Sequence, residues 1–279
     1  MPQFQTILLI GCGNMAGAML EGWLAGGLSP ARFTVVEPSD RALPAGIVRL
    51  RSLPENGDFD AILLGVKPQL LDAVATGVAR LAGDATILSL LAGVELATLA
   101  QRFPTAAAHV RVMPNLAVAL GKAPIALAGR GLDEAGRAAL VGLLEPLGTP
   151  DWVGEAEFDL VTALAGSGPA FVYRFIDALA AAAVGLGLPR EQAGRMALAM
   201  VEGAAALAAS SPDSPGALAD RVASKGGMTR EGLDVLDANG ALVALLTQTL
   251  RAARDRGAEL AAEARKPLDQ RQRGEAGFP

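Results

Sequence analysis

The sequence ILLIGCGNMA, residues 7–16, decides the fold of the N-terminal half of the chain. Its apolar run is typical of a buried strand, and the apolar residues that follow recur at helical spacing, so the glycines form a strand-to-helix turn. Gly11 allows the turn, Gly13 lets a pyrophosphate approach the backbone, and Ala16 permits close helix–sheet packing, while the N–H groups of the helix start face the phosphates. We therefore predict a dinucleotide-binding turn, and the alternative is a purely structural turn. The predicted cofactor-binding residues are Ile10, Gly11, Cys12, Gly13, Asn14, Met15 and Ala16.

Further short apolar runs alternate with helical patterns and predict the rest of the fold. The runs are residues 33–36, 47–48, 61–64, 86–90 and 109–113. Strands separated by helices indicate a parallel, doubly wound α/β sheet of the Rossmann type, which we assign to an NAD(P)-binding domain over residues 1–155. Alanine-, leucine- and methionine-rich helical patterns then predict an all-α domain over residues 156–264, for dimerisation and substrate binding. The polar residues 265–279 are predicted to form a disordered tail.

Composition narrows the function to small-molecule chemistry. The chain has 279 residues, of which 51% are hydrophobic and 19% charged, and its net charge is −5. An acidic chain is not expected to bind nucleic acid or an anionic membrane surface, and its apolar runs are too short to span a bilayer. Because the sequence enters a strand without a basic leader, we expect a cytoplasmic protein. The single cysteine, Cys12, excludes an intrachain disulfide and a cysteine metal cluster, and we predict no metal site.

The residues after the second strand bear on the choice of coenzyme. Glu37 follows the glycine turn at the distance where an acid binds the ribose 2′-hydroxyl of NAD. Ser39 and Arg41 follow at once, and a hydroxyl with a guanidinium suits the 2′-phosphate of NADP. The pattern therefore leaves NADPH and NADH both open, and an acid in a solvated loop is a third interpretation.

A set of motifs in order gives the chain a family resemblance. They are Val66-Lys67-Pro68, Leu91-Ala92-Gly93-Val94, Arg111-Val112-Met113-Pro114-Asn115, residues 165–173 (AGSGPAFVY), Ser214-Pro215-Gly216 and residues 224–233. With the glycine turn, they make the chain resemble the pyrroline-5-carboxylate reductases, which make proline, from the first strand to about Lys266. The resemblance implies reduction of pyrroline-5-carboxylate by NADPH or NADH, in a homodimer that can assemble into a larger ring.

The resemblance also implies which residues line the coenzyme. Strand ends on one rim carry Val66, Lys67, Pro68, Ala92, Gly93 and Asn115. Small residues there admit a flat nicotinamide ring and a carboxamide can orient it, although ordinary turn chemistry can explain each residue singly. The GSGPAF segment indicates either a helix held against the ligands or a tight helix crossing.

The loop at residues 224–229 is the predicted substrate site. The N–H groups of Gly226, Gly227 and Met228 at a helix start make a nest for the substrate carboxylate, and Ser224 adds a hydroxyl. By resemblance, Thr229 contacts the ring nitrogen while hydride passes to the C=N carbon, so no strong general base is required. The commonest family form has proline and threonine where this chain has Lys225 and Met228, which leaves the rigidity of the loop in doubt.

Two other functions fit parts of the sequence. The β-hydroxyacid dehydrogenases also join a similar N-terminal domain to a helical domain and use a catalytic lysine on a helix, for which Lys225 is the candidate. A nucleotide-sensing protein that binds NAD(P) without turnover is the alternative outside the enzymes. His109, the sole histidine, lies inside an apolar run and is predicted to be a core residue rather than a catalytic one.

Overall fold

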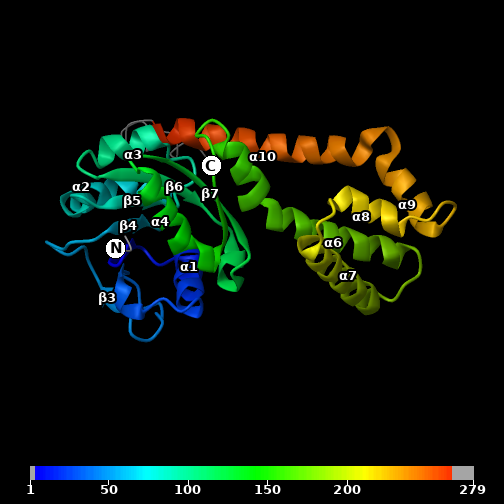
Figure 1. Cartoon of the computed structure of the whole chain (residues 1–279), viewed down its shortest axis with the longest axis horizontal. Coiled ribbons are helices and arrows are strands. Elements are labelled where there is room, and N and C mark those ends of the chain that lie inside the picture. Colours follow the sequence, from blue (N-terminus) through cyan, green and yellow to red (C-terminus); the bar gives the residue numbers. More distant parts are fainter. Residues whose placement is uncertain (1–3, 266–279) are drawn as a thin grey trace, which may run out of the picture. The chain divides into compact units, whose positions relative to one another are not determined.

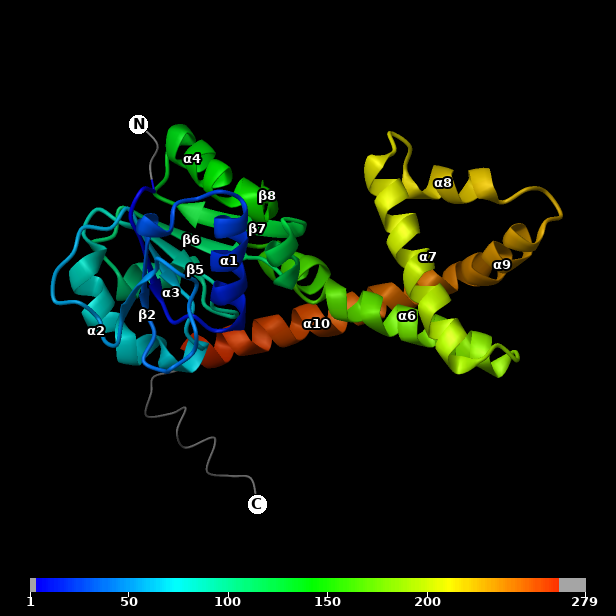
Figure 2. The same cartoon turned by 90° about the horizontal axis from the view of Figure 1, so that it is seen from below.

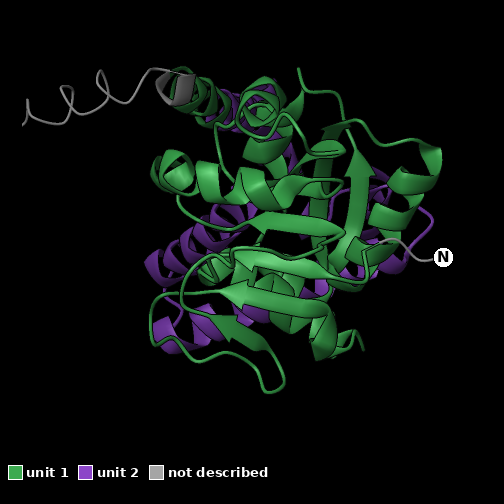
Figure 3. Ribbon diagram, turned by 90° about the vertical axis from the view of Figure 1, so that its left-hand side faces the viewer, with its two compact units in different colours: residues 1–166, 252–279 green, residues 167–251 purple. Residues whose placement is uncertain are grey.

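The computed structural model describes residues 4–265, and the predicted tail lies almost entirely outside them. The chain forms two compact units (Figure 3): unit 1 comprises residues 1–166 and 252–279, and unit 2 comprises residues 167–251. The boundary predicted at residue 155 falls inside unit 1, because the short helical segment before Gly166 packs with the sheet. The last helix begins in unit 2, and its residues from 252 onward belong to unit 1.

Unit 1 is built on an eight-stranded sheet of order β3-β2-β1-β4-β5-β6-β7-β8 (Figure 1). The strands are β1 (Ile7–Ile10), β2 (Phe33–Val36), β3 (Val48–Leu50), β4 (Ala61–Leu64), β5 (Thr86–Ser89), β6 (Ala108–Met113), β7 (Ala123–Arg130) and β8 (Gly148–Trp152). The first six strands are parallel, as predicted. The chain leaves β1 toward β2 on one side and returns to β4 on the other, so the sheet has its topological switch point between β1 and β4.

Helices cover both faces of the sheet (Figures 1 and 2). One core contains Ile7 and Leu9 of β1 with side chains of α1 (Asn14–Ala25) and α4 (Glu134–Leu144). The other contains Leu8 and Ile10 with side chains of α2 (Leu71–Ala82) and α3 (Leu96–Arg102). Burial on both faces is why the central strands are continuous apolar runs rather than alternating ones.

Two strands, β7 and β8, were not predicted from the sequence. Strand β7 pairs antiparallel with β6 and parallel with β8, so both run against the other six strands. Strand β7 has the sequence APIALAGR, and β8 contains Pro150 and is only partly buried. Small residues, glycine and proline weaken the usual strand signal, and here pairing with a neighbouring strand decides the structure.

The remaining short helices of unit 1 lie between the strands or follow β8. They are the 3-10 turns η1 (Pro30–Arg32), η2 (Pro68–Leu70), η3 (Leu116–Leu120) and η4 (Glu145–Leu147), the helix α5 (Phe158–Val161) and the π-helical turn η5 (Thr162–Gly166).

Unit 2 is entirely helical. It contains α6 (Gly168–Gly185), α7 (Arg190–Ser210), α8 (Pro215–Val222), α9 (Met228–Asp237), the turn η6 (Ala238–Gly240) and the first part of α10 (Ala241–Arg265). The predicted breaks near Gly187-Leu188-Pro189 and residues 210–215 separate α6 from α7 and α7 from α8. Among the described residues of α6 to α9, only Ala193 is buried.

Candidate dinucleotide site and substrate loop

The glycine turn lies at the switch point of the sheet, between the ends of β2 and β4. The N–H of Gly11 donates to the Val36 carbonyl at 2.9 Å, and the N–H of Gly65 donates to the Ile10 carbonyl at 2.9 Å. Gly11 has φ +81°, a conformation that favours glycine. A Cβ on Gly65 would lie 2.8 Å from both the Ala16 Cβ and the Gly11 carbonyl oxygen, so only small residues fit this helix–strand contact.

The N-terminus of α1 is open at Gly13. This glycine is the N-cap residue of α1, and no side chain caps the helix. A Cβ on Gly13 would meet a single atom within 4 Å, the Gly65 carbonyl oxygen at 4.0 Å. The first turn contains no acidic residue, and the N–H groups there have no intrahelical acceptor. A diphosphate therefore fits this cradle sterically and electrostatically.

Glu37 holds the backbone of the turn. Its carboxylate accepts from the N–H of Cys12 and from the N–H of Ser39, each at 3.0 Å. Burial opposes its ionisation, but these two bonds, the hydroxyl of Ser39 and the charge of Arg41 outweigh burial and hold the pKa of Glu37 below its usual value. Glu37, the residue that follows β2, is thus an anion that stabilises the glycine turn through the Cys12 N–H.

Cys12 is buried, as expected of a small filler in the turn. Burial, with the nearby carboxylates of Glu37 and Glu21, raises the pKa of its thiol despite the opposing charges of Arg41 and Arg49. A protonated, inaccessible thiol is a poor nucleophile, so the geometry gives Cys12 a packing role.

The segment after β4 forms the other wall of the switch point. Lys67 is exposed and precedes the 3-10 turn η2, in which Pro68 takes the first position, and the Leu70 N–H donates to the Lys67 carbonyl at 2.9 Å. Val66 packs beside the turn: its Cγ1 would lie 3.1 Å from a Cβ on Gly11. The side chains of the predicted Val66-Lys67-Pro68 motif thus begin directly beside the phosphate cradle.

Two residues assigned to the nicotinamide end have partners within unit 1. Gly93, which follows Ala92 after β5, has φ +73°, and a Cβ on it would lie 3.0 Å from the backbone of Leu260 and Ala261 in α10. Asn115 is buried; its Oδ1 accepts from the Ala117 N–H and its Nδ2 donates to the Ala165 carbonyl, each at 2.9 Å. Gly93 therefore allows α10 to pack closely against the loop after β5, and Asn115 links its own turn to Ala165. The sequence indicated neither role.

Sequence reasoning missed a buried arginine and the two partly exposed carboxylates that pair with it. Arg111 in β6 has a side chain that is 4% exposed; its guanidinium lies 3.1 Å from the Glu155 carboxylate and 3.6 Å from that of Asp159, over the ring of Phe158. Glu155 also accepts from the N–H of Leu96 at the start of α3. Arg111 and Asn115 together fasten residues 155–166 to the sheet. The sequence signal that could have revealed this cluster is an arginine within an otherwise apolar strand run.

His109 is a core residue, as predicted. It is 5% exposed, and its Nε2 lies 2.9 Å from the Phe103 carbonyl oxygen. Burial lowers the pKa of His109, and Arg130 adds to this effect against the opposing bond to Phe103. The imidazole lies on the strand well before its carboxyl end, so it is remote from the rim that carries the glycine turn.

The predicted substrate loop lies in unit 2, between α8 and α9. Gly226 has φ +72°, and Gly227 is the N-cap residue of α9, so the predicted helix start is present. The N–H of Gly227 donates to the Ser224 carbonyl at 2.9 Å, which removes it from the predicted set of free donors. A Cβ on Gly227 would collide with the Ser224 hydroxyl. Gly227 therefore lets Ser224 fold over the helix start.

The side chains of the loop are accessible in the single chain. Ser224, Met228 and Thr229 are exposed, and Lys225 lies in the turn rather than on a helix. Arg230, which the sequence analysis did not single out, pairs with three carboxylates, those of Asp220, Asp234 and Asp237. The pair with Asp220, at 3.6 Å, ties the start of α9 to the end of α8, and the other two lie within α9.

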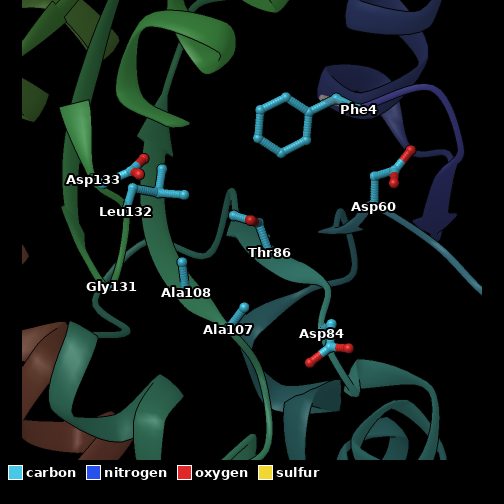
Figure 4. Close-up of a pocket in the computed structure, with 9 residues that line it drawn as sticks. All are labelled: Phe4, Asp60, Asp84, Thr86, Ala107, Ala108, Gly131, Leu132 and Asp133. Carbon is cyan, nitrogen blue, oxygen red and sulfur yellow. The ribbon is translucent and has the colours of Figure 1, made fainter. Parts of the chain in front are cut away.

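A separate pocket of about 400 Å³ lies at the opposite edge of the sheet (Figure 4). It is lined by Phe4, Asp60, Asp84, Thr86, Ala107, Ala108, Gly131, Leu132 and Asp133. Thr86 and Ala108 begin β5 and β6, so this pocket is at the amino ends of the parallel strands. It is not part of the dinucleotide cradle, which is at the carboxyl ends.

Residues 4–265 also bear on membrane insertion and metal binding. No helix in this range is both long and apolar enough to cross a membrane. The same residues contain no group of three or more histidine, cysteine, aspartate or glutamate side chains arranged to hold a metal ion.

A doubly wound sheet with a glycine turn at its switch point defines a dinucleotide-binding protein. A family model described as pyrroline-5-carboxylate reductase dimerisation matches residues 155–260. The chain is 36% identical over 264 residues to the pyrroline-5-carboxylate reductase of Pseudomonas aeruginosa, covering 91% of this chain and 96% of that protein. It is 33% identical over 266 residues to that of Methanosarcina acetivorans, covering 92% and 98%. The chain therefore belongs to the pyrroline-5-carboxylate reductase family.

A solved structure agrees with this assignment. The pyrroline-5-carboxylate reductase of Coxiella burnetii superposes with a TM-score of 0.84 at 28% sequence identity, covering 92% of this chain and 99% of that one. The similarity thus includes both the sheet and the helices.

Proposed function

We propose that this protein reduces 1-pyrroline-5-carboxylate to L-proline with hydride from NADPH or NADH, the last step of proline biosynthesis. The observation that carries the proposal is identity of 36% to a curated reductase over nearly the whole of both chains. The open cradle at Gly13 supports it independently, because that cradle suits the pyrophosphate of a dinucleotide.

The geometry of the rim supports an assignment of the residues that would hold the coenzyme. We assign the pyrophosphate to the N–H groups at the start of α1, from Gly13 to Ala16, and the adenosine ribose to the loop at Glu37, Ser39 and Arg41. The motif at Val66, Lys67 and Pro68 forms the facing wall. When bound, the reduced nicotinamide supplies the hydride, and the chain contributes position and electrostatics.

The substrate is assigned to the loop before α9. The carboxylate of the imine accepts from N–H groups of the first turn of α9 at Met228 and from the hydroxyl of Ser224. The substrate reacts as the protonated imine: the Thr229 hydroxyl contacts the ring N–H, hydride adds to the C=N carbon, and the nitrogen keeps its proton as the amine forms. Lys225 lies in a turn and not mid-helix, so the arrangement of the hydroxyacid dehydrogenases, with a catalytic lysine on a helix, is not the one proposed.

The helical unit supports a homodimer. Large apolar side chains are exposed along its helices, among them Val172, Tyr173, Phe175, Leu186, Met196, Leu198, Met200, Leu207, Val235 and Leu245. Exposed apolar surface of this extent marks an interface, and a closed symmetric dimer is the usual way to bury it. Assembly of dimers into a larger ring and a cytoplasmic location remain predictions.

The proposal is tested by mixing the purified protein with pyrroline-5-carboxylate and either NADPH or NADH and following the loss of reduced-nicotinamide absorbance. The matched control replaces the imine by β-hydroxyacids with the oxidised coenzymes. Oxidation with the imine and no reaction with the hydroxyacids is expected. Coenzyme binding with no turnover of either substrate would instead favour a nucleotide sensor.

A further inference from the structure

Two arginines hold the loop between β2 and β3: Arg49 lies in β3, and Arg51 directly follows it. Arg49 donates through Nη1 to the Ser39 carbonyl at 3.4 Å and through Nη2 to the Arg41 carbonyl. Arg51 donates to the Pro38 carbonyl at 2.9 Å and to the Ser39 carbonyl at 2.7 Å. These four bonds go to backbone oxygens, so they fix the course of the loop without using the side chains of Ser39 and Arg41.

Fixing the loop in this way directs Arg41 toward the coenzyme cradle. Its Nη1 lies 3.3 Å from Oδ1 of Asn14, the first residue of α1. Its Nη2 would lie 3.3 Å from a Cβ on Gly17, one turn further along the helix. The guanidinium therefore lies against the side of the first turn of α1. Gly17 leaves room for it.

The acid at the end of β2 is already engaged. Both carboxylate oxygens of Glu37 accept backbone N–H groups, from Cys12 and Ser39. An acid at this position favours NAD when it binds the ribose 2′-hydroxyl. In this chain the two backbone bonds compete with that interaction. Glu37 acts here as a structural anion, and the usual signal for NAD is weakened.

The charge of the loop favours an anion. Arg41, Arg49 and Arg51 contribute three positive charges, and Glu37 and Asp40 contribute two negative ones, in a chain whose net charge is −5. Asp40 pairs with Arg51 at 2.6 Å. A positive excess that persists in an acidic protein, next to an exposed serine hydroxyl, suits a phosphate monoester.

We propose that this chain selects the coenzyme that carries a 2′-phosphate, with Ser39 and Arg41 as its direct contacts and Arg49 as the residue that positions them. The inference rests on the proposed function and deepens it. Arg49 acts through the Ser39 and Arg41 carbonyls, so it is a positioning residue whose loss affects the 2′-phosphate and not the rest of the dinucleotide.

Calorimetric titration of the purified protein with NADP⁺ and with NAD⁺ tests this without turnover. The unsubstituted protein is expected to bind NADP⁺ at least about ten-fold more tightly, the contribution of one charge-assisted hydrogen bond. Arg41→Gln and Arg49→Gln should each weaken NADP⁺ binding about ten-fold while NAD⁺ binding changes less than about two-fold. Arg49→Lys, which keeps the charge, should restore part of the loss. Arg80→Gln, at an exposed position of α2, is the control and should change neither affinity.

Equal or tighter binding of NAD⁺ by the unsubstituted protein would overturn the inference and leave imine reduction with NADH intact. Equal loss of both affinities in Arg49→Gln and Arg49→Lys would show that Arg49 only supports the fold. Failure to bind either coenzyme would instead refute the dinucleotide site itself.

Discussion

Replacing Gly13 by valine separates coenzyme binding from folding. The position has space for a side chain, since a Cβ there meets only one atom, at 4.0 Å, and its φ of −66° is accessible to any residue. The cost to the free energy of unfolding is about that of a poorer N-cap residue, ~1 kcal/mol or less. In contrast, the new side chain occupies the space through which a diphosphate reaches the N–H groups of α1.

The loss of affinity follows from the bonds displaced. Two charge-assisted hydrogen bonds of ~1.5–3 kcal/mol each correspond to at least about a 100-fold loss. Gly65→Ala is the matched variant: its Cβ would lie 2.8 Å from Ala16 Cβ and from the Gly11 carbonyl oxygen, so overpacking should cost ~1–3 kcal/mol of stability. Calorimetric titration gives the affinities and urea denaturation gives the stabilities.

The two variants are expected to show opposite patterns. Gly13→Val should lose the coenzyme and keep its stability, whereas Gly65→Ala should lose stability first. Normal coenzyme affinity in Gly13→Val would refute the reasoning, because it would place the pyrophosphate away from the start of α1.

Three further predictions concern single residues. Thr229→Ala should lower kcat by ~1–3 kcal/mol of transition-state stabilisation with unchanged coenzyme affinity, and Thr229→Ser should retain most of the activity; an unchanged rate in Thr229→Ala would remove this hydroxyl from the mechanism. Asn115→Ala should lower the free energy of unfolding by about 2 kcal/mol in urea titrations, because the cap of η3 and the buried bond to the Ala165 carbonyl are lost together. A change below about 0.5 kcal/mol would contradict this structural role of Asn115. Because the pKa of His109 is lowered below 6.5 in the folded chain, the unfolded chain gains its proton first as pH falls, so stability should decline below about pH 6.5 and the decline should be smaller in His109→Gln. An identical pH profile in the variant would show that other groups cause it.

The first strand, turn and helix could be predicted from the sequence because all their signals are local. An apolar run, two glycines and helical spacing lie within a few residues of one another, and the structure places β1 and α1 accordingly. The helix breaks in unit 2 were predictable for the same reason, since glycine, proline and serine interrupt an apolar period there.

Features that depend on distant partners were not predictable. Strand β7 exists because β6 offers it an edge, and its own small residues give little indication of a strand. The role of Gly93 depends on Leu260 and Ala261, far away in the sequence. Likewise, Glu37 is recognisable as an acid after β2, but only the folded turn shows that its oxygens accept from Cys12 and Ser39. The sequence therefore shows that Glu37 is an acid at this position, but it does not show which groups Glu37 bonds.

The most direct test of the account follows hydride into the product. The purified protein is given pyrroline-5-carboxylate and NADPH or NADH in which both hydrogens on the reactive carbon of the nicotinamide are deuterium, and the product is examined by mass spectrometry and NMR. The account predicts L-proline carrying deuterium on the ring carbon that was doubly bonded to nitrogen. Unlabelled proline, or no proline although the coenzyme binds, would contradict the claim that this chain is an imine reductase.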